Sequence, residues 1–236
     1  MNLLLKLSGN DFKLIFRDAS LRFFLALPLL IFLVINYFVP YLITEFPVVK
    51  DYLPYIFIAA TIQIVQMFGF IYAMVFIDEK DTQVAKVYGI LPVNKSGFTF
   101  GRLAIPIAIS ILVTYLLLVL QPFYSFSFEQ KLGATFLIAI LSVAYPLMIA
   151  ILSTNKMEGM TWVKGLNIIV ILPLATYFVP TTYSYFFAIF PTYWLFEFIK
   201  EMIEGSFSVT HFVISALYLG LVVFFSMSFF VKRHFV

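Results

Sequence analysis

Six long apolar runs, separated by short polar segments, constrain this chain more than any other feature. They cover roughly Leu21–Thr44, Tyr55–Ile77, Phe98–Leu120, Leu132–Leu152, Leu166–Phe187 and Phe212–Val231. Each is close to the ~20 helical residues that cross ~30 Å of hydrocarbon. Because a backbone in lipid must pair its own polar groups, such runs cross a bilayer as helices. We therefore predict an all-α polytopic membrane protein with six transmembrane helices in one domain, residues 1–236.

Composition supports the same class. The sequence is 63% hydrophobic and its mean hydropathy is +1.03, whereas soluble domains are only ~45–50% apolar. The chain has no cysteine, which excludes disulfides and thiol chemistry. A net charge of +3 is too small to indicate a nucleic-acid partner.

Residues 1–20 are predicted to form an interfacial helix rather than a span. A helix capped by Asn10 or Asp11 would separate its apolar residues from its charged ones, with Phe12, Ile15, Phe16 and Ala19 on one face and Lys13, Arg17 and Asp18 on the other. Basic amphipathic helices of this kind lie along anionic head groups. A plain polar leader before the first span is the alternative.

The loop charges predict the orientation. With the N-terminus inside, all of the 15 basic residues except three lie on the cytoplasmic side; the exceptions are Lys50, Lys131 and Lys200. The positive-inside rule then places both termini in the cytoplasm, in a multi-pass protein of the cell (inner or plasma) membrane.

The longest charged interruption between two apolar runs is Asp78–Arg102. Within it, apolar residues recur at i, i+3, i+4 and i+7 and predict one stripe of a short helix: Val84, Val87, Tyr88 and Leu91. Asp81 or Thr82 would cap this helix, and Gly89 with Pro92 would end it. A second helix, capped by Ser96, would lead into the third span. We interpret the stretch as a cytoplasmic coupling helix that docks a partner.

Two other loops are predicted to be ordered. Residues 191–210 interleave aromatic and charged side chains, which predicts an outer interfacial or re-entrant helix between spans five and six, ended by Gly205. Residues 153–165, STNKMEGMTWVKG, are predicted to form an inner loop broken at Gly159 and Gly165.

No residue pattern predicts catalysis, a cofactor or a metal site in this chain. The two histidines, His211 and His234, lie at opposite ends of the last span, and there is no HExxH, no GxSxG and no phosphate-binding GxxxxGK[ST] loop. The acidic residues near Asp78 have lysines among them, which favours a solvated charged face over a cation site.

The spans hold almost no charge, so an ion-driven transporter is not indicated and the energy for transport would come from a partner. Some of the polar residues within spans are candidates for a translocation path or a subunit interface: Asn36, Gln63, Gln66, Thr114 and Asn167. Gln63 and Gln66 are one helical turn apart. The alternative is interhelical hydrogen bonding, worth ~0.6 kcal/mol each.

Three stretches together resemble the permease subunit of the type-two ABC exporter family, and within it the small fluoroquinolone-export permeases. They are the leader NDFKLIFRDASLRFFLALPLL, with Arg17, Asp18 and Pro28; the loop DEKDTQVAKVYGILPVNKSGFTFGRL, with Glu79, Lys80, Thr82, Leu91, Pro92 and Arg102; and the inner loop STNKMEGMTWVKG. The run PTYWLFEFIKEMIEG occupies the place of that family's outer re-entrant helices.

The resemblance implies a partner-driven exporter. In that family two permease subunits, identical or related, sit in membrane lipid and work with two separate ATPase subunits, which bind the ATP and Mg. The implied ATPase-coupling residues here are Glu79, Thr82, Val84, Val87, Tyr88 and Leu91. The substrate would be hydrophobic or amphipathic: a drug-like compound, a lipid or a peptide.

Two other classes remain open on the sequence. A structural or assembly membrane protein would leave the activity of an ATPase unchanged. An intramembrane enzyme would need a convergent set of acid, base or metal-binding residues within the spans, and the sequence does not indicate one.

Overall fold

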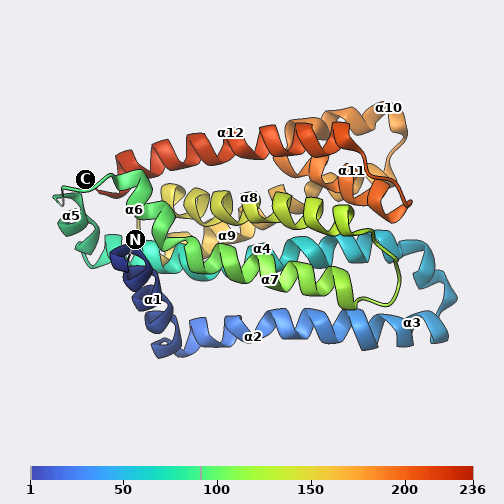
Figure 1. Cartoon of the computed structure of the whole chain (residues 1–236), viewed down its shortest axis with the longest axis horizontal. Helices are drawn as coiled ribbons and strands as arrows, with labels where there is room; N and C mark the ends of the chain where they lie inside the picture. Colours follow the sequence, from blue (N-terminus) through green and yellow to red (C-terminus); the bar gives the residue numbers. More distant parts are fainter. Residues whose placement is uncertain (1, 91, 236) are drawn as a thin grey trace.

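The computed structural model describes residues 2–90 and 92–235. Throughout these residues every regular element is a helix and no strand occurs, which confirms the predicted all-α class (Figure 1). The predicted coupling residue Leu91 lies outside the described residues.

Five helical segments in the described chain are long and apolar enough to cross a membrane. They are α2 (Ala19–Leu33) with η1 (Val34–Phe38) and α3 (Val39–Glu45), η2 (Pro47–Tyr52) with α4 (Leu53–Asp81), α8 (Phe128–Leu152), α9 (Lys156–Ile171) with η3 (Leu172–Phe178), and α12 (Val209–His234). The pair α6 (Lys95–Arg102) and α7 (Ala104–Leu120), bent by 40°, adds a sixth if it counts as one span. The chain is thus a multi-pass membrane protein, and six spans stay a prediction.

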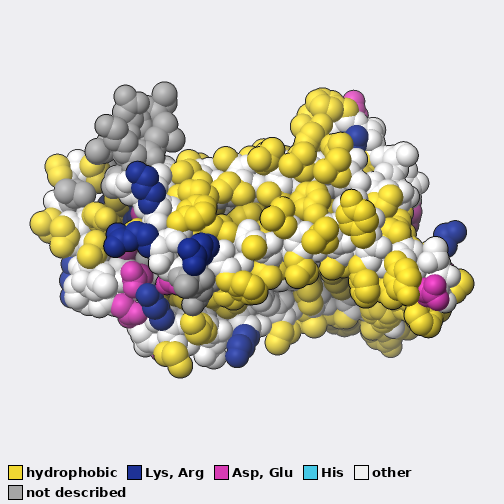
Figure 2. All heavy atoms as spheres, turned by 90° about the horizontal axis from the view of Figure 1, so that it is seen from below, with side chains coloured by type: hydrophobic (Ala, Val, Ile, Leu, Met, Phe, Trp, Pro, Cys, Tyr) yellow, Lys and Arg dark blue, Asp and Glu magenta, His cyan; other side chains and the backbone are white. Residues whose placement is uncertain are grey.

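The bundle has two different ends (Figure 1). One, called here the termini end, holds both chain termini together with α1 (Asn2–Arg17) and α5 (Val84–Gly89). The other, the distal end, holds α3, α10 (Thr181–Ser184), η4 (Tyr185–Ile189) and α11 (Pro191–Ile203). Figure 2 shows a largely hydrophobic flank between the ends and most charged side chains at the termini end.

Helices α4 and α8 form the centre of the bundle. Their apolar windows are 67% buried, against 22% for those of α2 and α12, so the latter two present most of their surface outward. Gly69 of α4 lies directly against the Tyr145 ring of α8, where an added Cβ would approach Cδ1 to 2.4 Å. Glycine at this position therefore lets the two central helices pack closely.

The predicted loop over residues 153–165, broken at Gly159 and Gly165, is mostly helical in the structure. Helix α9 begins at Lys156 and runs through Gly159 and Gly165, and its span covers Lys156–Phe178 rather than Leu166–Phe187. Gly159 is a packing residue, because a Cβ there would lie 2.6 Å from Ile77 Cδ1 and 2.9 Å from Met74 Cε. Pro173 lacks an N–H, and the helix narrows to the 3-10 segment η3 from Leu172.

Two predicted helix caps also differ from the structure. Helix α1 is continuous through Asn10 and Asp11, so neither residue caps it. Helix α6 is capped by Asn94, whose side-chain oxygen accepts from the N–H groups of Ser96 and Gly97, rather than by Ser96 itself. The observed cap lies two residues before the predicted one, because the Asn94 side chain reaches the N–H groups of both the second and the third residue of α6.

A helix does form in the outer aromatic segment. Helix α11 turns one apolar face inward, with Leu195, Phe198 and Ile199 fully buried, and ends where Gly205 adopts a φ of +91°. Its depth relative to a membrane, like that of α1, stays a prediction.

Candidate functional site

The turn from α4 into α5 projects a short helix from the termini end. Gln83 adopts a left-handed conformation with a φ of 62°, which reverses the chain within one residue. Its side-chain amide donates to the Lys80 carbonyl at 3.1 Å, and the Thr82 hydroxyl donates to the Asp78 carbonyl at 2.7 Å. The predicted caps of α5, Asp81 and Thr82, therefore belong to the end of α4, and Gln83 occupies the N-cap position of α5.

Helix α5 has one inward and one outward side. Ala85 is buried, and the Tyr88 ring packs 5.4 Å from the Phe98 ring of α6. The outward side carries apolar residues that are open to solvent: Val84 is 37% exposed, Val87 57%, and Ile90 82%. The predicted stripe is thus divided, because Tyr88 faces the bundle while both valines face away.

Arg102 anchors this helix to the bundle. The residue is only 2% exposed, and its guanidinium forms a forked ion pair with Glu79: Nη1 donates to Oε2 at 2.9 Å, and Nη2 donates to Oε1. Its Nε donates to Asp11 Oδ2 at 2.7 Å. One arginine therefore joins α6 to α4 and to α1.

Aromatic rings and the C-terminal turn complete this cluster. The guanidinium carbon of Arg102 lies 5.1 Å from the ring centre of Phe76, 5.5 Å from that of Tyr88 and 5.6 Å from that of Phe98. His234 Nε2 is 3.1 Å from Glu79 Oε2, which brings in the end of α12. We call Asp11, Glu79, Arg102 and His234 the anchor cluster.

Burial changes the chemistry of the groups around the anchor cluster. It raises the pKa of the Asp11 carboxyl, against the opposing effect of the neighbouring Arg102 charge. It also raises the pKa of the Tyr88 hydroxyl. Removing one partner of such a buried pair leaves a charge without compensation, which makes the cluster costly to break.

The C-terminal tail closes over α5 from the other side. A Cβ at Gly89 would lie 2.4 Å from the backbone oxygen of Phe235, so only glycine permits this contact. The Phe235 ring lies 6.3 Å from Phe98 and 6.1 Å from Phe230. The inward side of α5 is therefore fixed by α6 and by the end of the chain.

The structure distributes the predicted coupling residues unequally. Glu79 is 8% exposed and points into the anchor cluster, away from the outward side of α5. Thr82 is exposed, as are Val84 and Val87. Ile90, which the sequence reasoning did not select, is the most exposed apolar residue of the group.

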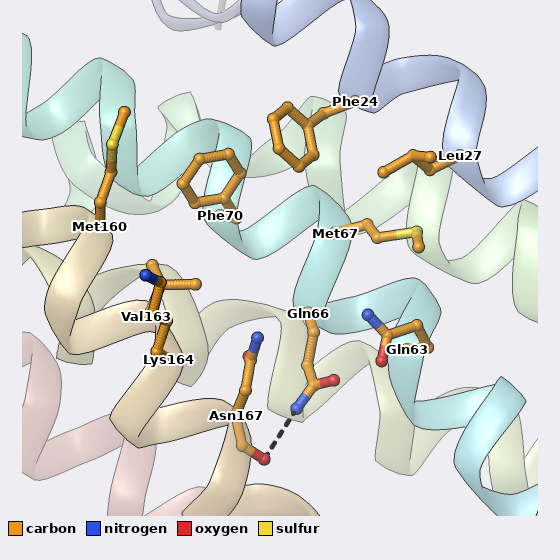
Figure 3. Close-up of a pocket in the computed structure, with 10 residues that line it drawn as sticks. All are labelled: Phe24, Leu27, Gln63, Gln66, Met67, Phe70, Met160, Val163, Lys164 and Asn167. Atoms are coloured by element: carbon orange, nitrogen blue, oxygen red, sulfur yellow. Dashed lines mark hydrogen bonds between the residues drawn. The ribbon is translucent and has the colours of Figure 1, made fainter.

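A second feature is a pocket of about 320 Å³ between α2, α4 and α9 (Figure 3). Its walls are mostly apolar, and its polar groups are two glutamines, an asparagine and a lysine: the lining residues are Phe24, Leu27, Gln63, Gln66, Met67, Phe70, Met160, Val163, Lys164 and Asn167. Apolar walls with a few converging polar groups are typical of small-molecule sites.

Hydrogen bonds fix one side of this pocket. Gln66 Nε2 donates to the Asn167 carbonyl at 3.4 Å, and the Tyr145 hydroxyl donates to the Asn167 side-chain oxygen. Gln63, Gln66 and Asn167, proposed from sequence as a group, therefore lie together. Asn36 and Thr114 do not join them: the Asn36 amide donates to the Phe32 carbonyl of its own segment at 2.9 Å, and Thr114 is buried in α7.

Sequence reasoning missed the anchor cluster. Arg102 was noted only as part of a loop motif, and Asp11 and His234 were given no role in it. A lone arginine at the head of an apolar run was the available signal, since a charge so placed needs partners. Across the described residues, no group of three His, Cys, Asp or Glu side chains is arranged to hold a metal ion.

One of the comparisons with known proteins gives a match. No curated protein and no solved structure matches the chain. A family model described as "Fluoroquinolones export permease protein Rv2686c-like" matches residues 11–227. This range is most of the sequence. It includes α5, every anchor-cluster residue except His234, and all residues that line the pocket between α2, α4 and α9. The chain therefore belongs to the Rv2686c-like family of fluoroquinolone export permease proteins.

Proposed function

We propose that this chain is the membrane permease subunit of an ATP-driven exporter, and that the outward side of α5 is where a separate ATPase subunit docks. The observation that carries the proposal is the contrast between the two sides of α5. Val84, Val87 and Ile90 are exposed at the end of the molecule, while the opposite side is tied down by buried charges. Exposed apolar groups of this kind mark protein contacts.

The anchor cluster suits α5 to transmit force. A push on α5 passes through Tyr88 and Glu79 to Arg102, and from there to α1, α6 and the end of α12. A helix that was attached to the bundle only through exposed side chains would move without displacing the other helices. The chain itself has no nucleotide-binding loop, so ATP and Mg would be bound by the partner.

The assembly would contain two ATPase subunits and a second permease subunit, identical or related, in the cell membrane. The family's description, which names fluoroquinolone export, supports a hydrophobic or amphipathic drug-like compound as the substrate. The apolar pocket with its amide groups is where such a molecule would bind.

Co-purification tests the proposal with a matched pair of variants. Val87 on α5 and Val48 on η2 are 57% and 61% exposed at opposite ends of the bundle. Val87→Asp should reduce the ATPase recovered with the tagged chain by about tenfold, because a carboxylate in an apolar contact costs at least ~1.4 kcal/mol. Val48→Asp should not change it. Equal recovery of the ATPase with both variants would favour a structural membrane protein. The same conclusion would follow if the ATPase activity were unchanged by the presence of this subunit.

A further inference from the structure

A second pocket, distinct from the drug-sized one, lies at the termini end beside α5. It has a volume of about 520 Å³ and is lined by four cationic residues, Lys80, Lys86, Lys232 and Arg233, together with Gln83 and Thr154 among others. These residues come from the end of α4, the turn into α5, helix α5, the segment after α8 and the end of α12. Neither the coupling contact nor the substrate pocket accounts for so much positive charge in one cavity.

Acidic side chains only partly balance the cations in this basic pocket: the Glu158 carboxylate accepts from Thr154 of its lining and attracts Lys80 without forming an ion pair. Among the described side chains, no carboxylate lies within ion-pair distance of any of the four. The Lys80 ammonium donates to the Ala150 and Ser153 carbonyls, the latter at 3.0 Å, which fixes it at the end of α8. Lys86, Lys232 and Arg233 are exposed to the pocket and its mouth.

A neighbouring cavity at the same end is different. It is lined by Arg17 and Lys156 but also by Asp18, Asp78 and Glu79, and the Lys156 ammonium pairs with Asp78 Oδ1 at 2.5 Å. Charges of both signs therefore balance there. In the basic pocket the four cations outnumber the nearby Glu158 carboxylate, so an anion from outside the chain would offset the remaining repulsion between them.

The level of the basic pocket indicates which anion this is. Three segments that qualify as membrane spans end beside it: α4 at Asp81, α8 at Leu152 and α12 at His234. The phosphate of a phospholipid lies at the depth where spans end. Basic pockets between span ends on the cytoplasmic side bind anionic head groups.

We propose that the basic pocket binds the phosphate-bearing head group of one anionic phospholipid. Lys86 and Arg233 approach it from α5 and α12, so the bound lipid links the coupling helix to the end of the last span. Gln83, whose side-chain amide donates to the Lys80 carbonyl, also lines the pocket. This proposal needs only the membrane and stands whether or not an ATPase docks on α5.

Native mass spectrometry of the purified full chain tests it without any partner. The chain would be released from neutral detergent micelles that contain phosphatidylglycerol or phosphatidylcholine at low mole fraction. We expect one retained phosphatidylglycerol and no retained phosphatidylcholine. Since each Lys or Arg near an anionic head group contributes ~1 kcal/mol, or about fivefold in affinity, Lys86→Gln/Lys232→Gln/Arg233→Gln should weaken retention by at least about tenfold.

One control separates the proposal from general electrostatics. Lys50→Gln/Lys131→Gln removes two cations from the distal end, outside both the pocket and α1, and should change retention by less than about twofold. If the pocket variant fails to fold, the exposed single change Lys86→Gln replaces it, with about fivefold weaker retention expected.

Several results would overturn the proposal. They are equal retention of phosphatidylglycerol and phosphatidylcholine, equal losses in pocket and control variants, and full displacement of the lipid by millimolar inorganic phosphate, which would assign the pocket to a soluble anion. An unchanged lipid affinity with lost ATPase recovery in the pocket variant would assign the basic pocket to an acidic surface of a partner protein instead.

Discussion

At the scale of single residues, Arg102 has the most demanding environment in the molecule. It is a fully buried arginine whose ring neighbours and carboxylate partners come from different helices. An ion pair in such a place is not a general source of stability, because desolvation offsets much of the attraction. The ion pairs instead fix the relative positions of α1, α4 and α6, because the Arg102 guanidinium bonds to Asp11 on α1 and to Glu79 on α4.

Replacing Arg102 should therefore destabilise the termini end strongly. Arg102→Gln leaves Glu79 and Asp11 buried without their cation, and we expect a loss of ~3–5 kcal/mol in unfolding free energy. Thermal unfolding in detergent, with the exposed Arg17→Gln as a control expected to be within ~0.5 kcal/mol, measures the difference. Equal stability of the two variants would show that the anchor cluster is not formed.

Gly89 permits a different close contact in the same region. Gly89→Ala places a methyl group against the Phe235 carbonyl and should displace the C-terminal tail from α5, costing ~1–3 kcal/mol. Gly165→Ala in α9, where nothing lies within 4 Å of the added Cβ, should be neutral or stabilising by up to ~1 kcal/mol. Protease accessibility of the tail reports the displacement, and a tail equally protected in both variants would contradict the contact.

At the scale of elements, sequence periodicity located the helices but not all their ends. The apolar runs predicted the five long apolar helical segments found in the described residues, because lipid admits few alternatives to a helix. The start of α9 was not predicted, because Gly159 and Gly165 were interpreted as helix breakers. In the structure both lie within α9, and Gly159 packs against Ile77. The anchor cluster was not predicted for another reason. Its bonded partners lie far apart in the sequence: Glu79 and His234 are 155 positions apart. No local sequence pattern indicates which of these residues come into contact.

The pocket between α2, α4 and α9 could be predicted in part from the sequence. Gln63 and Gln66 share a helical face, which indicated their proximity, but only the packing of α9 on α4 adds Asn167. Asn36 is chemically similar and equally within a span, yet it bonds to its own helix. Side-chain chemistry alone therefore does not identify the residues that line a path.

This difference between the amides gives a test of the pocket. Gln63→Leu/Gln66→Leu should lower export of a drug-like substrate several-fold while the protein level is retained, since the hydrogen bonds lost are worth only ~0.6 kcal/mol each in folding. Asn36→Leu should leave export unchanged. Drug accumulation in cells measures both, and unchanged export in the glutamine variant would make these residues packing elements only.

At the scale of the whole molecule, the distribution of basic residues between the two ends predicts one orientation of the bundle in the membrane. The distal end carries Lys50, Lys131 and Lys200, and the termini end carries the larger share of basic residues (Figures 1 and 2). The positive-inside rule then predicts that α5, the anchor cluster and the basic pocket lie in the cytoplasm.

The absence of cysteine makes this orientation easy to measure. Single substitutions Val48→Cys and Val87→Cys create exposed thiols at opposite ends of an otherwise cysteine-free chain. In intact cells a membrane-impermeant maleimide should label Val48→Cys only, and Val87→Cys should react after lysis. The reverse pattern would place α5 outside the cell, where no ATPase could reach it.

The docking of α5 on an ATPase is tested most directly by site-specific cross-linking in cells. A photoreactive amino acid in place of Val87 should give a covalent product with an ATP-binding subunit, and the same amino acid in place of Val48, equally exposed at the distal end, should not. A Val87 position that cross-links only to lipid, or to no nucleotide-binding protein, would contradict the account.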